Sequence, residues 1–384
     1  MKAFELALLM AFVAPVSFAF GQKTAARATE GHESRVDGFN SLVAKAEAAR
    51  EKDQVEQAIR LYRRAVEIKP DYVEGWWYLG TLLYESDQYT DGAIAFRHVT
   101  GLKPEMALGW AMLGLCQFEA KDYESALVHL ERSDQLGIPR AESFYDVSKY
   151  HLALLLTRSG DFDSAIRIAA DFAVRDKDGP DLTEAMGLAA LRKPLLPSEL
   201  PPLEREMVID VGHAMCDAAA RRAAVLNSDI ALLLSKYPKA PEIHFLAGTM
   251  ELSSNSDQAL ADWKAELEIS PAHARALASI AGEYLRRKEY PTARPYAERA
   301  VAASPGDCVP HAVLGQALAE GDIDLPRGIH ELEAAIHFAP AQSQVHFLLA
   351  AAYAKAGRKQ DAAKERAEFL RLRSQGEVAR SNPQ

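Results

Sequence analysis

Positively charged residues are in the minority in this sequence. Its 384 residues include 44 Lys and Arg against 54 Asp and Glu, which gives a formal net charge of −10. A protein that binds nucleic acid needs a basic surface that follows the phosphates, and no basic stretch of that kind stands out here. We therefore exclude nucleic acid as an expected partner and relate the acidic balance to solubility.

The sequence also lacks the motifs of common enzyme classes. It contains no G-x-x-x-x-G-K-[ST] loop, no H-E-x-x-H pair and no G-x-S-x-G turn, which carry phosphate binding, zinc chemistry and acyl transfer elsewhere. The histidines are scattered, and His330 and His337 have no carboxylate or cysteine set that would complete a metal site. Acidic pairs such as Asp161 and Asp163 fall at predicted turns, where Asp caps helices. We expect no catalysis, no metal and no cofactor.

Long apolar runs are absent except near the N-terminus. After Lys2 and Glu5, residues 6–20 form an apolar run of about 15 residues, which is shorter than the roughly 20 needed to span a bilayer. Small residues follow, and a signal peptidase would cut after Ala19 or after Gly21. We expect a cleavable signal peptide over residues 1–21 and a secreted or periplasmic protein. A retained membrane anchor is the alternative.

Internal repetition is the main positive feature. The strings EIKPDYVEGWWYLG and GLKPEMALGWAMLG place Pro70 and Pro104 34 residues apart. The same W-x-x-L-G pattern follows each proline, beginning at Trp76 and at Trp110. In the second half, prolines recur at steps of 33, 34 and 35 residues, at Pro238, Pro271, Pro305 and Pro340.

This pattern resembles the tetratricopeptide-repeat (TPR) family, whose 34-residue signature is W-x2-L-G-x2-Y, then A-x3-F, then P. The resemblance covers residues 39–372, although Tyr84 and Phe118 sit one place later than the family's aromatic, and Leu277 and His346 stand at the Trp position. It implies an all-α, right-handed superhelical solenoid of helix-turn-helix repeats, with about eight or nine helix pairs.

Helical periodicity agrees with the resemblance. In DQVEQAIRLYRRAVEI, apolar residues recur every three or four positions, as in an amphipathic helix. One position of each repeat is small, which lets the two helices of a pair approach closely; these residues are Gly80, Gly114, Ala281, Gly315 and Ala350. Each hairpin has an apolar face that only a stacked neighbour can bury.

Cysteine is rare, with only Cys116, Cys216 and Cys308 in the chain. They lie several repeats apart, whereas a disulfide needs Cα atoms within about 7 Å. We expect no intrachain disulfide and three small, buried, apolar side chains.

The predicted organisation has six parts. A signal peptide (1–21) and a polar lead-in (22–38) precede an N-terminal array (39–179), a proline-rich insertion (180–203), a C-terminal array (204–372) and a disordered tail (373–384). The insertion holds Pro180, Pro194, Pro197, Pro201 and Pro202. So many prolines cannot lie within a regular helix pair, and we expect one short helix there, near residues 182–191.

The resemblance places a partner-binding groove on the first helices, at the second, fifth, ninth, twelfth and thirteenth residue of each repeat. In the N-terminal array these positions are apolar and aromatic, which suits an apolar segment of a partner. The groove residues are Trp77, Tyr84, Leu108, Leu115, Phe118, Tyr150 and Leu154. The alternative is that these side chains pack between neighbouring first helices and line no open groove. In the C-terminal array the same positions hold smaller, mixed residues such as Gly282.

We therefore expect a non-catalytic protein–protein interaction scaffold outside the cytoplasm, with a protein or peptide partner. The alternatives are an accessory subunit of an envelope enzyme and a self-associating module that forms a homo-oligomer. The Lys/Asn/Arg clamp with which some TPR domains bind a C-terminal carboxylate is missing, because Val43, Tyr78, Leu108 and Met112 stand at its positions.

Overall fold

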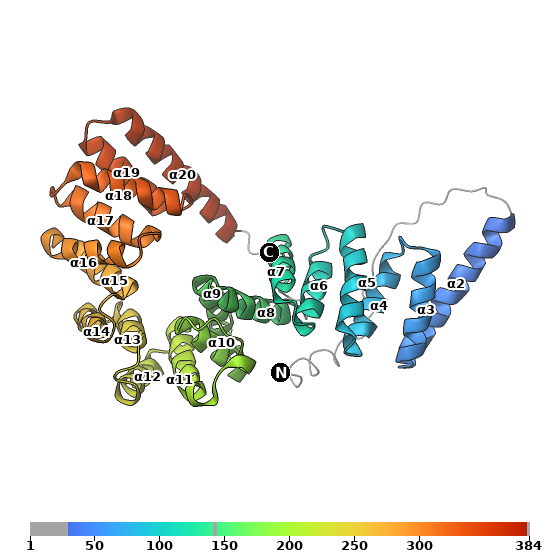
Figure 1. Ribbon diagram of the computed structural model, residues 1–384. Helices are drawn as coiled ribbons and strands as arrows, with labels where there is room; N and C mark the ends of the chain where they lie inside the picture. Colours follow the sequence, from blue (N-terminus) through green and yellow to red (C-terminus); the bar gives the residue numbers. More distant parts are fainter. Residues whose placement is uncertain (1–29, 141–143, 382–384) are drawn as a thin grey trace. The chain divides into compact units, whose positions relative to one another are not determined.

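The computed structural model describes residues 30–140 and 144–381, and within these ranges it contains helices and no strand (Figure 1). Within each unit, successive helices pack against each other as hairpins, and hairpins pack against the next hairpin along the chain. The predicted all-α repeat solenoid is confirmed. The predicted signal peptide lies outside the described residues.

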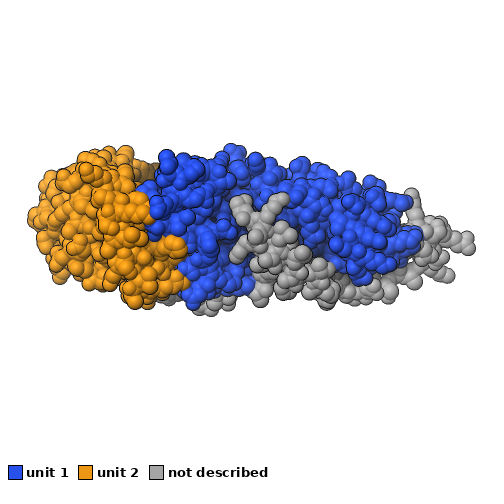
Figure 2. Space-filling view, turned by 90° about the horizontal axis from the view of Figure 1, so that it is seen from below, with its two compact units in different colours: residues 1–212, 384 blue, residues 213–383 orange. Residues whose placement is uncertain are grey.

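The chain divides into two compact units, residues 1–212 and 213–383 (Figure 2). The first unit holds α2 (Glu30–Glu51), α3 (Val55–Ile68), α4 (Val73–Glu85), α5 (Tyr89–Leu102), α6 (Ala107–Glu119), α7 (Tyr123–Leu136), α8 (Phe144–Ser159), α9 (Phe162–Val174), α10 (Pro180–Ala190), the 3-10 turn η1 (Pro197–Glu199) and most of α11 (Pro202–Ala219). The second holds the rest of α11 and α12 (Ala223–Lys236), α13 (Ile243–Glu251), α14 (Ser256–Ile269), α15 (Ala274–Arg286), α16 (Tyr290–Ala303), α17 (Cys308–Glu320), α18 (Leu325–Phe338), α19 (Ser343–Lys355) and α20 (Lys359–Ser381).

Acidic and amide side chains cap the N-termini of several helices that come second in their repeats. Asp161 accepts a hydrogen bond from the Ser164 backbone N–H at 3.1 Å, and Asn255 accepts one from Gln258 at 3.1 Å. These caps satisfy N–H groups that have no partner within the helix. The capping role expected for Asp161 is confirmed.

Small residues set the distance between paired helices, as the sequence predicts. A Cβ atom on Gly80 would lie 2.8 Å from the Phe96 ring. On Gly114 it would lie 2.8 Å from Leu130 Cγ. These separations are below van der Waals contact, so the first helix reaches its partner only where a side chain is missing.

The proline-rich stretch is more ordered than an irregular insertion. Its helix α10 packs on α8 and α9, and the loop after it buries Leu196, Pro197 and Leu200. The Glu199 carboxylate accepts a hydrogen bond from the Leu196 N–H at 2.8 Å and pairs with Arg158 of α8. Pro180 stands in the first turn of α10, where a missing N–H costs nothing.

Both ends of the described chain are more helical than the sequence predicts. Helix α2 begins at Glu30, inside the expected polar lead-in, and α20 continues to Ser381, inside the expected tail.

The three cysteines are free. Cys116 is fully buried, and this burial raises the pKa of its thiol to about 12.

Candidate functional site

The predicted groove residues of the N-terminal array lie in the core. Trp77, Tyr84, Leu115, Phe118 and Leu154 are at most 7% exposed and belong to one buried cluster. Leu108 and Tyr150 are half-buried and pack against the same cluster. The expectation of an open aromatic strip is therefore corrected, because these side chains fill the space between neighbouring helices.

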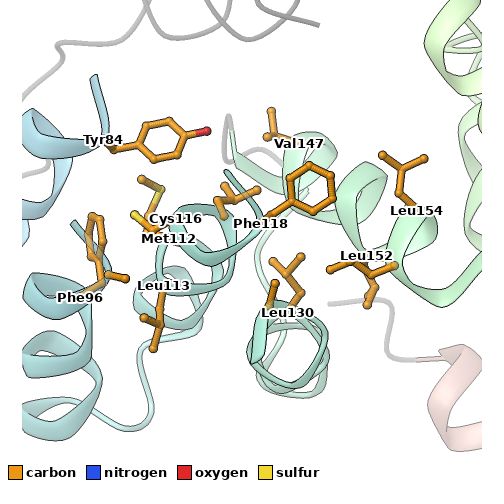
Figure 3. Close-up of a cluster of buried hydrophobic side chains, with 14 of the residues drawn as sticks. Tyr84, Phe96, Met112, Leu113, Cys116, Phe118, Leu130, Val147, Leu152 and Leu154 are labelled. Atoms are coloured by element: carbon orange, nitrogen blue, oxygen red, sulfur yellow. The ribbon is translucent and has the colours of Figure 1, made fainter. Parts of the chain in front are cut away.

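Ring contacts explain why these aromatics are not free. The Trp77 ring meets Phe96 edge-on at 5.4 Å between centroids, and Tyr84 meets Tyr89 in the same way at 5.4 Å. The Phe118 ring lies 4.6 Å from His151 of α8, and Figure 3 shows it directed toward that helix. Each of these side chains is long enough to contact a neighbouring helix, so it fills the space between the two helices.

The C-terminal array differs because some of its equivalent positions are small, although Phe347, Gln316 and Leu285 are not. Gly282 is the ninth residue of its repeat, and a Cβ there would meet nothing within 4 Å. A cleft of about 610 Å³ opens beside it. We call this the serine cleft; it is lined by Leu252, Ser253, Ser254, Ser256, Trp263, Ser279, Gly282, Glu283 and Arg286.

A second cleft, of about 320 Å³, lies farther along the same array. We call it the alanine cleft; it is lined by Tyr290, Gln316, Ala319, Glu320, Leu332, Leu348, Ala351, Ala352 and Lys355. Gln316 and Ala351 are the ninth residues of their repeats, and Ala319 is a twelfth. At the twelfth position, alanine stands where the N-terminal array has Tyr84 and Phe118.

Fixed charges mark one end of the serine cleft. The buried Glu283 carboxylate accepts hydrogen bonds from Arg286 Nε and Arg287 Nε, each at 2.7 Å. The bond from Arg286 is the main cause that lowers the pKa of Glu283 to about 2. The carboxylate is therefore ionised at neutral pH, and it holds the exposed Arg286 guanidinium in place at the rim.

The alanine cleft combines an apolar floor with polar edges. Lys355 Nζ donates to the Ala319 carbonyl at 2.6 Å and pairs with Asp322 at 2.5 Å. Gln316 Nε2 donates to Glu320 Oε1 at 3.2 Å. Side chains of this kind can hydrogen-bond a peptide backbone, while small apolar residues leave room for its side chains.

The sequence analysis did not predict these two clefts, although part of the signal was present. Gly282 and Ala351 at ninth positions and Ala319 at a twelfth position leave space beside their helices, although Gln316 at a ninth position and Leu285 at a twelfth position are larger. The sequence analysis noted smaller residues at these positions of the C-terminal array. It nevertheless predicted the groove in the N-terminal array, because aromatic residues are common binding anchors.

Within the described residues, no group of three or more His, Cys, Asp or Glu side chains is arranged to hold a metal ion. The described helices include none that is long and apolar enough to cross a bilayer.

Comparisons with known proteins identify the repeats. A TPR repeat model matches residues 46–87, and a tetratricopeptide repeat model matches residues 79–136 and 253–307. No curated protein matches the chain. Among solved structures, a crystal structure of MamA protein is 19% identical over 48% of this chain and 93% of that chain, with a TM-score of 0.38. MamA 41-end from Desulfovibrio magneticus RS-1 is 18% identical over 60% and 96%, with a TM-score of 0.29. The matched repeats fall in both units, so each unit contains tetratricopeptide repeats.

Proposed function

We propose that this chain is a non-catalytic scaffold outside the cytoplasm, which binds a segment of a partner protein along the first helices of its C-terminal array. The repeats support the general role, because stacked helix pairs present an extended surface for other proteins. The apolar run at residues 6–20 supports the location.

One observation carries the choice of surface. Gly282 of α15, Ala319 of α17 and Ala351 of α19 leave the serine and alanine clefts open, whereas buried side chains such as Leu115, Leu154, Tyr84 and Phe118 occupy ninth and twelfth positions in the N-terminal array. An extended or helical segment could insert side chains into both clefts. Arg286 and Lys355 at the rims would favour acceptor groups on that segment.

Filling the clefts tests the proposal. Gly282→Leu and Ala351→Phe place bulk in the serine and alanine clefts, and Gly101→Leu is the matched control, because a Cβ there also meets open space on α5. Wild type and control should capture the same partner from the native extracytoplasmic fraction. The two cleft variants should lose it while keeping wild-type helicity. Undiminished capture by both cleft variants would refute the choice of surface.

The location has its own test. Mass spectrometry of the protein purified from native cells should show a mature N-terminus at Phe20 or at Gln22. An intact Met1 in protein recovered from the cytoplasm would contradict this part of the proposal, and it would leave the cleft experiment unaffected.

A further inference from the structure

The alanine cleft occupies a place that an aromatic ring of the chain itself fills in the N-terminal array. Helices α6 and α17 correspond, because each has a glycine at its closest approach to the second helix of the hairpin. A Cβ on Gly114 would lie 2.8 Å from a leucine of α7, and a Cβ on Gly315 would lie 2.6 Å from a leucine of α18. Four residues after these glycines stand Phe118 and Ala319, which are therefore equivalent.

The helices that follow, α8 and α19, correspond as well. His151 and Leu348 each stand eleven residues before the next helix, which begins at Phe162 and at Lys359 respectively. The Phe118 ring centroid lies 4.6 Å from that of His151 (Figure 3), and Leu348 lines the alanine cleft. A phenylalanine ring thus fills the space between α6 and α8. Alanine at the same position leaves the space between α17 and α19 open.

The cleft is large enough for such a ring. Its volume is about 320 Å³, whereas a cavity of about 150 Å³ lined by Leu, Ile and Phe already takes up benzene. The apolar part of its wall is formed by Leu332, Leu348, Ala351 and Ala352. An aromatic side chain that enters removes its apolar surface from water.

A cation at the edge of the cleft is complementary to a ring. In the N-terminal array the Arg158 guanidinium lies 4.7 Å from the centroid of the Tyr123 ring. Lys355 is the equivalent of Arg158, because each stands four residues before the next helix, and Leu325 replaces Tyr123 as the first residue of its helix. Lys355 lines the cleft, and an ammonium group is attracted to the negative face of an aromatic ring.

The serine cleft lacks these properties. Glu283 and Ala352 both hold the tenth position of their repeats, and each lines its cleft. The Glu283 carboxylate is buried and ionised, and a negative charge repels the face of a ring. The two clefts therefore select different side chains.

We propose that the alanine cleft is a socket for one aromatic side chain, that of Phe, Tyr or Trp, on the partner segment. This inference rests on the proposed function and adds the chemistry of the residue that the segment inserts. The ring takes the place that Phe118 holds between α6 and α8, packs on Leu348 and Ala351, and lies beside the Lys355 ammonium group.

Titration of the full chain with N-acetyl-phenylalanine amide tests the socket. In a chain with methyl-labelled alanine, nuclear magnetic resonance should show saturable shifts of the Ala319 and Ala352 methyl signals, which Ala319→Ser and Ala352→Ser assign. The dissociation constant should be millimolar, as expected for so small a ligand. N-acetyl-leucine amide, which has no ring, should bind about threefold more weakly. Unmoved signals, or equal affinity for the two amides, would overturn the proposal.

A variant that fills the cleft from within locates the binding. Ala351→Phe should abolish the shift of the Ala352 signal, whereas Val309→Phe, at a position of α17 that is 54% exposed and outside the cleft, should retain it. A shift that persists in Ala351→Phe would overturn the socket.

The titration needs no partner, so the socket and the proposed function can fail separately. Partner capture that is unaffected by both cleft variants would contradict the proposed function, while a saturable shift in the titration would still support the socket. Capture that is lost in both cleft variants, without a saturable shift in the titration, would overturn the socket alone.

Discussion

Two glycines at the crossing of α10 and α11 show how closely helices meet in this fold. A Cβ on Gly187 would lie 1.9 Å from the Val208 carbonyl oxygen, and a Cβ on Gly212 would lie 1.9 Å from that of Thr183. Backbone atoms cannot rotate away as a flexible side chain can. The crossing therefore requires glycine on both helices.

We predict that Gly187→Ala destabilises the protein by about 2 kcal/mol or more, because the helices must separate to admit one methyl group. Urea unfolding measures the change. Gly101→Ala is the control: a Cβ there meets nothing within 4 Å, and it should be neutral or stabilise by about 0.5–1 kcal/mol. A Gly187→Ala protein as stable as wild type would show that the crossing is looser than described.

Glu251, the last residue of α13, has a carboxyl group whose raised pKa makes the stability of the fold depend on pH. Burial, followed by the neighbouring Asp262 carboxylate, raises the pKa of Glu251 to about 7. The folded state then binds a proton that the unfolded chain releases at lower pH, so this contribution to stability is lost as the pH rises from about 4.5 to about 7.

Replacing Glu251 by Gln should flatten that dependence. We expect Glu251→Gln to be more stable than wild type at pH 8, by about 1–2 kcal/mol, and to lose less stability between pH 4.5 and 8. Glu268→Gln on the exposed face of α14 should leave the wild-type profile unchanged. Parallel profiles for wild type and Glu251→Gln would contradict the shifted pKa.

At the scale of the element, Phe118 of helix α6 is a side chain whose place on the helix can be predicted from the repeat spacing, whereas its burial cannot. The repeat spacing predicts Phe118 on the inner side of its helix. It does not reveal that His151 and Tyr123 pack against the ring from α8 and α7. Whether an inner residue faces a partner or fills a gap depends on the size of side chains in the next repeat.

Phe118→Ala should therefore reduce stability and not merely binding. A buried Phe replaced by Ala costs about 3–5 kcal/mol, which denaturant unfolding would detect. Val128→Ala, at a position 61% exposed on α7, should change stability by no more than about 0.5 kcal/mol. If Phe118→Ala were as mild as Val128→Ala, the ring would not belong to the core.

The positions of several first helices could be predicted from the sequence. The W-x-x-L-G segments that begin at Trp76 and Trp110 lie within α4 and α6, and Leu277 and His346, which stand at the Trp position, lie within α15 and α19. The structure of the proline-rich stretch was harder to predict, because proline is excluded from helix interiors but tolerated in the first turn. Pro180 and Pro202 stand at the first residues of α10 and α11, and η1 begins at Pro197.

For the whole molecule, the two units are built alike but present different inner faces. Unit 1 encloses its aromatic residues in the core, and unit 2 leaves the serine and alanine clefts open. The repeat pattern specifies the general role of a protein-interaction scaffold. The repeat pattern does not identify the partner. The clefts define a shape and a set of hydrogen-bonding groups, and many partner sequences can match both.

The most direct test of the account is to find which surface touches the partner. A photoreactive amino acid at position 282 or 351 would probe the clefts, and one at position 128 would probe the exposed side of α7. We predict crosslinks to a partner protein from positions 282 and 351, and none from 128. Crosslinks from 128 alone would contradict the assignment of binding to the C-terminal clefts.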